Sequence, residues 1–116
     1  MVPIQGSDFS HITIFTTWPS EETAKAAARS LIERKLSACA NIFSSGTSIY
    51  SWKNEIHEDT EVFMFLKTTR KLFEANRAEI AKLHPYDCPC IVGFPIANGE
   101  KSYLDWIKTQ TTKVKK

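Results

Sequence analysis

The 116-residue chain has few glycines and no long apolar run. Its four glycines are far apart, at positions 6, 46, 93 and 99, so no glycine-rich loop is available to bind a phosphate. A nucleophile elbow and a His-Glu metalloprotease motif are also missing. No apolar stretch approaches the roughly 20 residues that span a bilayer, and residues 1–7 lack the basic and apolar regions of a secretory signal. We therefore expect a non-enzymatic protein with no membrane partner.

Cysteine and surplus charge are also scarce. The chain has three cysteines, an odd number, which without a secretion signal favours reduced thiols and a cytoplasmic location. The formal net charge is +2, but three of the 15 basic residues are lysines at the C-terminal end, and without them 12 basic residues face 13 acidic ones. A body without a basic excess argues against a nucleic-acid partner.

Apolar periodicity predicts one domain, residues 8–110, with residues 1–7 and 111–116 as flexible tails. We expect strands at 10–17, 38–53, 56–68 and 90–97, and helices at 20–35, 69–83 and 102–110. This β-α-β-β-α-β order with a C-terminal helix predicts an α+β, ferredoxin-like fold. Right-handed crossovers would place the first two helices on one face of an antiparallel sheet. Their buried stripes should be Ala24, Ala27, Ala28, Leu31 and Ile32, then Leu72, Phe73, Asn76 or Ala75, Ile80 and Leu83.

Residues 38–68 read as one unusually long β-hairpin. Ser44-Ser45-Gly46 predicts a bulge or bend in the outgoing strand, and Lys53-Asn54-Glu55 predicts the turn. An outgoing arm of sixteen residues extends about 50 Å at roughly 3.3 Å per residue, whereas a domain of this size has a radius of gyration of about 13 Å. The tip of the hairpin should therefore project beyond the domain.

The returning strand of this hairpin carries five apolar residues in a row, from Val62 to Leu66. Such a run indicates that both faces of the strand are covered. The helices cover only one face, so the other must bind a ligand, such as RNA, or pack on other subunits. Phe63 and Phe65 have the spacing of an RNA-binding sheet, but the basic, glycine-containing consensus of that motif is missing. Packing between subunits is the better interpretation.

Several short motifs in order resemble the CutA divalent-cation tolerance family. They extend from Ile12 to Ile107 and include Ala38-Cys39-Ala40-Asn41-Ile42, Ser48-Ile49-Tyr50-Ser51-Trp52, Glu61, Lys67-Thr68, His84-Pro85-Tyr86, Pro89, Pro95-Ile96, Gly99 and Tyr103-Leu104-Asp105-Trp106. The resemblance implies a homotrimer with the architecture of the PII signalling proteins. It also implies a role in tolerance of copper and other divalent cations, while animal homologues are linked to acetylcholinesterase anchoring. No catalytic reaction is established for the family.

The metal candidates are His84, Cys88 and Cys90. The resemblance points to His84, because some members bind copper through a histidine here, although Leu83 and Thr16 replace two residues that are ligands in those members. Independently, two thiolates and an imidazole suit Cu(I) or Zn²⁺. The alternatives are a packed turn histidine and two small apolar side chains beside a proline. We expect copper or another divalent ion as the bound cofactor and no organic cofactor.

A further group of residues is predicted to line a ligand cleft or the trimer interface. Its aromatic members suit packing between subunits, and its charged pair suits an ion pair or an anionic ligand. The residues are Tyr50, Trp52, Glu61, Lys67, Tyr86 and Trp106. A PII-like scaffold or small-molecule sensor that uses clefts between subunits is the alternative function, by analogy of fold alone.

Overall fold

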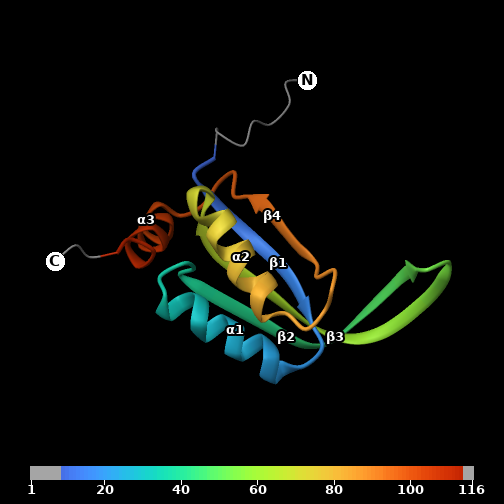
Figure 1. Cartoon of the computed structure of the whole chain (residues 1–116). Coiled ribbons are helices and arrows are strands. Elements are labelled where there is room, and N and C mark those ends of the chain that lie inside the picture. The colour runs from blue at the N-terminus through green and yellow to red at the C-terminus, as the bar shows by residue number, and fades with distance from the viewer. Residues whose placement is uncertain (1–8, 114–116) are drawn as a thin grey trace.

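The computed structural model describes residues 9–113 and has the predicted order of elements (Figure 1). These are β1 (His11–Trp18), α1 (Glu21–Glu33), β2 (Cys39–Trp52), β3 (Glu55–Thr69), the 3₁₀ turn η2 (Arg70–Leu72), α2 (Phe73–Leu83), β4 (Ile91–Pro95) and α3 (Lys101–Gln110). The strands form one antiparallel sheet in the order β2-β3-β1-β4. The α+β class is therefore confirmed. No helix in the described range has the length and hydropathy of a membrane span.

The core lies between the sheet and the helices α1 and α2, which cover one face together (Figure 1). Alternate residues of the central strands point into it, and small alanines let α1 approach closely. The buried members are Ile12, Ile14, Trp18, Val62, Met64 and Leu66 of the sheet, Ala24, Ala27, Ala28 and Leu31 of α1, and Ile80 of α2. Ser20 caps α1, its hydroxyl accepting the N–H of Thr23 at 3.2 Å.

Several predicted details are wrong. Ile32 is 40% exposed, because it lies roughly 90° around the helix from the middle of the alanine stripe. Leu83, in the last turn of α2, is 41% exposed. The second helix begins at Phe73 rather than at Thr69, because η2 precedes it. Thr111, which we assigned to a flexible tail, is buried, and its hydroxyl donates to the Ile107 carbonyl at 2.9 Å. The predicted tail at 1–7 lies outside the described residues.

The long hairpin projects from the body of the molecule (Figure 1), and the radius of gyration is 15.3 Å. Its turn consists of Lys53 and Asn54 with φ of 51° and 67°, a two-residue turn that leaves Glu55 paired with Trp52. The predicted bulge is confirmed by a register shift between Phe43 and Gly46. A Cβ at Gly46 would lie 2.5 Å from the Phe63 ring, so any larger residue there would have to displace that ring.

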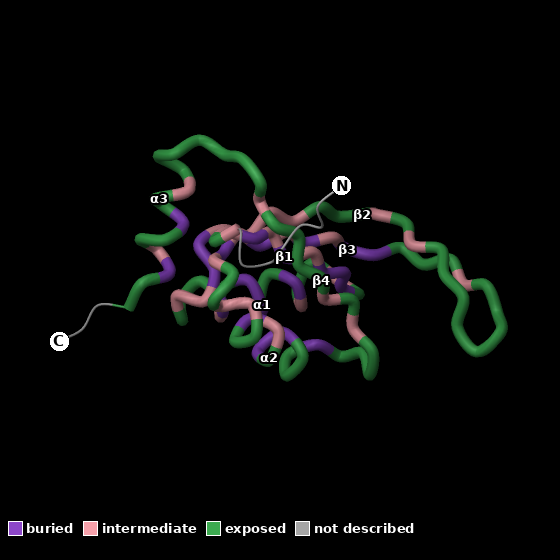
Figure 2. Tube along the Cα trace, turned by 90° about the horizontal axis from the view of Figure 1, so that it is seen from above, coloured by how far each residue is buried: buried purple, intermediate pink, exposed green. Residues whose placement is uncertain are grey.

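The face of the sheet opposite α1 and α2 carries a second apolar surface. We call it the open face and define it by Phe15, Phe43, Phe63, Phe65, Val92 and Phe94, which strand register places on one side. The Phe15 ring lies 5.1 Å from that of Phe65 and 5.6 Å from that of Phe63. Phe43 is 57% and Phe94 is 54% exposed. Figure 2 shows that the projecting part of the hairpin is mostly exposed, while buried residues lie in the body and in α3.

Candidate functional site

A cavity of about 680 Å³ lies on the open-face side of the sheet, at the base of the hairpin. Three parts of the chain form its walls: the paired strands β1 and β3, the outer half of β2, and the loop between α2 and β4. The lining residues are Phe15, Thr17, Glu61 and Phe63, then Ser48, Tyr50 and Trp52, then Pro85, Tyr86, Asp87, Cys88 and Cys90. We call this cavity the hairpin cleft. Six of the nine predicted site residues line it.

His84 anchors the loop that closes the hairpin cleft. Its Nε2 lies 2.7 Å from the Thr17 carbonyl oxygen, which can only accept, so Nε2 carries the proton. The Nδ1 atom accepts the backbone N–H of Tyr86 at 3.2 Å. The buried imidazole also stacks on Trp18, with ring centroids 4.3 Å apart. Both nitrogens are thus used in neutral hydrogen bonds, and ligation of a metal would require one of them to break.

Glu61 is the charged centre of the hairpin cleft. Its residue is only 7% exposed, and one of its carboxylate oxygens accepts the Tyr86 hydroxyl at 3.2 Å. Among residues 9–113 no lysine, arginine or histidine forms an ion pair with it, and none lines the cleft. A buried carboxylate with a single neutral hydrogen bond is poorly compensated. The site therefore favours a positively charged occupant.

Three titratable neighbours have raised pKa values. Burial, and then the charge of Glu61, raises the pKa of Tyr86 above its usual value. Burial and Glu61 also raise the pKa of the Cys90 thiol. The hydrogen bond that Tyr50 donates to Asp59 raises the pKa of Tyr50 to about 12. Each of these acids therefore keeps its proton more firmly here, mainly through burial for Tyr86 and Cys90, with the charge of Glu61 adding to it.

Cys88 and Cys90 are both free thiols and both line the hairpin cleft. Of the three predicted metal ligands, these two line the same cleft as Glu61, whereas His84 does not. Within the described range, however, no three or more His, Cys, Asp or Glu side chains are grouped as a metal site. One subunit therefore lines the cleft with two thiols and a carboxylate that do not form a complete tetrahedral set.

Lys67 and Trp106 lie outside the hairpin cleft. The Lys67 ammonium donates to the Asn41 side chain, in a strand register that also places Cys39 beside it. Cys39 is half-buried. The Trp106 ring stacks on that of Tyr103 in α3, with centroids 5.5 Å apart. A role for Lys67 or Trp106 at a subunit interface stays a prediction.

Sequence reasoning missed several lining residues, above all Phe15, Thr17 and Asp87. The β1–β3 register brings Thr17 opposite Phe63 and Phe15 opposite Phe65. The first and third strands of a ferredoxin-like fold lie side by side, so counting back from the hairpin would have placed Phe15 and Thr17 at its base. Asp87 had no such signal, because it depends on the path of the loop.

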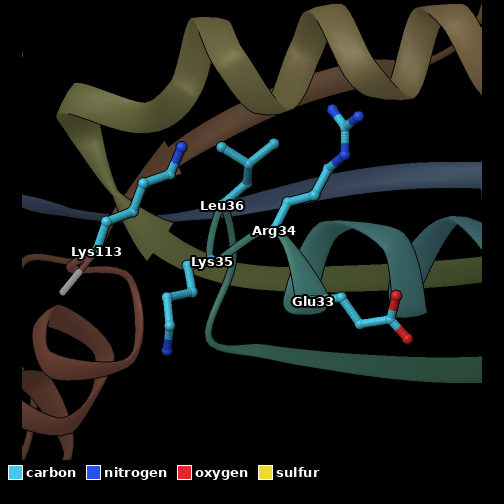
Figure 3. A pocket seen from close by; sticks show the side chains of 5 residues that line it. All are labelled: Glu33, Arg34, Lys35, Leu36 and Lys113. Carbon is cyan, nitrogen blue, oxygen red and sulfur yellow. The ribbon is translucent and has the colours of Figure 1, made fainter. Parts of the chain in front are cut away.

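A second cavity, of about 650 Å³, lies at the C-terminal end of α1 (Figure 3). Its lining includes Arg34, Lys35 and Lys113. Arg34 already pairs with Glu79 at 3.3 Å, and Figure 3 shows the Lys35 and Lys113 side chains pointing in different directions. The carbonyl end of a helix also carries partial negative charge. The basic side chains of this cavity therefore do not converge on one bound anion, and the hairpin cleft is the better candidate.

The charge of Glu61 predicts a measurable effect on thiol chemistry. In a Cys39→Ser/Cys88→Ser background, Glu61→Gln should lower the pKa of Cys90 and so increase its thiolate fraction at pH 8. We expect alkylation by iodoacetamide to become roughly twofold to threefold faster, because burial remains the larger cause of the raised pKa. Glu58→Gln, on the opposite face of β3, is the control and should leave the rate unchanged. An equal acceleration by both variants would refute the proximity argument.

A family model described as CutA1 divalent ion tolerance protein matches residues 12–110. The chain belongs to the CutA1 family. It is 44% identical over 98 residues to the divalent-cation tolerance protein CutA of Thermus thermophilus, covering 84% of this chain and 95% of that protein. It is 39% identical over 100 residues to the human protein CutA, covering 86% of this chain but 56% of the human one. The resemblance seen in the sequence is thus confirmed.

Solved structures of CutA1 proteins share the fold. The structure from Thermus thermophilus superposes with a TM-score of 0.86 at 42% identity, covering 88% of this chain and 99% of that one. CutA1 from Oryza sativa gives a TM-score of 0.87 at 33% identity, covering 91% and 97%. The described domain therefore corresponds to nearly the whole of these CutA1 chains.

Proposed function

We propose that the protein is a non-enzymatic, cytoplasmic homotrimer that acts in divalent-cation tolerance, with the hairpin cleft as its cation site. One observation carries the proposal: Glu61 is a buried carboxylate without a basic partner among the described residues, in a cleft that also holds two free thiols. Membership of the family supports the tolerance role, since the Thermus thermophilus relative is named a divalent-cation tolerance protein.

The homotrimer is supported by two apolar surfaces that one chain leaves uncovered. The open face carries phenylalanines that are more than half exposed, and an apolar face of this kind usually marks an interface. The projecting hairpin adds Ile49 and Ile56, which are 65% and 83% exposed. A ferredoxin-like subunit packed around a threefold axis, as in PII proteins, would cover the open face and let each hairpin lie across a neighbour.

The thiols are better placed than His84 to bind a metal ion. His84 uses both nitrogens in hydrogen bonds to backbone atoms, whereas Cys88 and Cys90 are free and exposed. Two thiolates suit Cu(I), which accepts low coordination numbers and soft ligands, better than Zn²⁺, which needs four donors. Because the pKa of Cys90 is raised, uptake should strengthen as the pH increases and the thiol loses its proton.

Calorimetric titration with Cu⁺, Cu²⁺ and Zn²⁺ tests this proposal. We expect Cu⁺ to bind most tightly, and the Cys88→Ser/Cys90→Ser variant to bind it at least about a hundredfold more weakly, because serine is a poor soft-metal ligand. Cys39→Ser is the matched control and should bind as the wild type does. Equal Cu⁺ binding by the double variant would exclude the thiols. A deletion strain complemented with each variant would then show whether copper sensitivity follows binding.

A PII-like small-molecule sensor is the second candidate, and the walls of the hairpin cleft favour it. Aromatic rings come from β1, β2, β3 and the loop, more apolar surface than a metal ion needs. A thermal-shift screen of small organic ions distinguishes this function, since a ligand of the folded state raises the melting temperature.

A further inference from the structure

We propose that the hairpin cleft binds an alkylammonium group, packed against its aromatic rings with the Glu61 carboxylate as counter-ion. The inference goes beyond metal tolerance: it shares the Glu61 carboxylate with the metal proposal but uses neither thiol. It combines a cavity of about 680 Å³, within the range of small-molecule sites, with a buried charge that the described residues leave without a cationic partner.

The aromatic wall is the first argument. Five rings line the cleft, those of Phe15, Tyr50, Trp52, Phe63 and Tyr86. They come from separate segments of the chain, so the fold rather than local sequence brings them together. Aromatic faces attract ammonium groups through the ring quadrupole, and tryptophan and tyrosine do so best. A cation seated among these rings keeps electrostatic stabilisation while its alkyl groups leave water.

The carboxylate is the second argument. Glu61 is more than nine-tenths buried and lines the cleft. Its orientation is set by the Tyr86 hydroxyl, and Tyr86 is itself held by the bond from its backbone N–H to His84. The counter-ion is therefore fixed before any ligand arrives. Asp87 adds a second acidic side chain to the lining, and an anionic ligand would meet only repulsion here.

The mostly apolar lining separates this ligand class from a metal ion. A metal ion in this cleft would rely on the two thiols, since residues 9–113 contain no group of three or more His, Cys, Asp or Glu that could hold it. An alkylammonium group needs one carboxylate and several ring faces, which the cleft has. Ser48 and Thr17 also line it, and their oxygens are possible acceptors for the N–H donors of a primary ammonium.

The test uses the indole N–H signals of the three tryptophans, Trp18, Trp52 and Trp106. Only Trp52 lines the cleft. Tetramethylammonium or n-butylammonium, titrated into the full-length protein at constant ionic strength, should shift the Trp52 signal and saturate, while the other two stay in place. The neutral n-butanol should bind at least about tenfold more weakly, because it lacks the charge. Tighter binding of either cation than of n-butanol supports the proposal. The cation that binds more tightly shows whether the cleft prefers a quaternary or a primary ammonium.

Matched variants locate the interaction. Glu61→Gln should weaken ammonium binding at least about tenfold, whereas Glu58→Gln, on the opposite face of β3, should not. Trp52→Leu should weaken it roughly threefold to tenfold, measured by calorimetry, and Trp106→Leu should leave it unchanged. Circular dichroism and the mass in solution confirm that each variant is folded.

Three results would overturn the proposal. The first is n-butanol binding as tightly as n-butylammonium, and the second is unchanged ammonium affinity in Glu61→Gln. The third is wild-type protein that binds no ammonium while Glu61→Gln loses its assembly, which would mean that Glu61 pairs with a group of a neighbouring subunit. The first uses the wild-type protein alone, so the proposal stays testable if a cleft variant fails to fold. Loss of Cu⁺ binding alone leaves this inference standing.

Discussion

Phe65→Glu is expected to turn the assembly into folded monomers. Phe65 lies in the middle of the open face, 5.1 Å from the Phe15 ring and 5.8 Å from the Phe43 ring between centroids. In a trimer, each glutamate would be buried against neighbours without a partner, and three like charges would meet near the axis. The free-energy cost of burying these charges, added to the apolar burial that is lost, exceeds roughly 4 kcal/mol. Assembly should therefore weaken more than about a thousandfold.

Light scattering at micromolar concentration measures this change. The wild type should have a mass of roughly 40 kDa, three times the 13.2 kDa of one chain, and Phe65→Glu should have the mass of a single chain with an unchanged circular dichroism spectrum. Ile32→Glu is the control, because Ile32 is also partly exposed but lies on α1, away from the open face. A wild-type monomer, or equal dissociation by both variants, would contradict the trimer proposal.

Local signals in the sequence were enough to predict the fold. The alanine stripe of α1, the Ser20 cap and the left-handed Asn54 each depend on neighbours within a few residues. Gly46 indicated the bulge correctly, and the structure gives a steric reason for a glycine there: the Phe63 ring occupies the space of a side chain. The wrong details lie at helix ends. At the end of α1, Lys35 takes the left-handed position, with φ of 59°, where glycine is the usual signal.

The candidate site was predicted in its members but not in its geometry. Tyr50, Trp52 and Glu61 share one face of the hairpin through period two, so their common cavity was within reach of pattern reasoning. The position of His84 was not. Its partners are the Trp18 ring and a backbone carbonyl of β1, and no side-chain pattern announces a carbonyl. The loop runs from the helix-covered side of β1, where His84 lies, to the open face, where Tyr86 and Cys88 line the cleft. The sequence pattern does not reveal that path.

That position makes His84→Ala the most informative single change for the metal hypothesis. The substitution removes a buried ring stacked on Trp18 and leaves the Thr17 carbonyl and the Tyr86 N–H without their partner. We expect the free energy of unfolding of the metal-free protein to decrease by about 3 kcal/mol per subunit. If His84 served only as a metal ligand, removing it from the metal-free protein should leave the free energy of unfolding almost unchanged.

Chemical denaturation in the presence of a chelator, at one protein concentration because assembly contributes to stability, measures the difference. His57→Ala is the control: its ring is partly exposed on the hairpin, so the change should cost less than about 0.5 kcal/mol. His84→Ala should keep the wild-type stoichiometry for Cu⁺, because Cys88 and Cys90 remain. Wild-type stability combined with lost copper binding would instead identify His84 as a ligand. A stability loss with copper binding retained would make it the anchor that holds Tyr86, and through Tyr86 the carboxylate of Glu61, in the hairpin cleft.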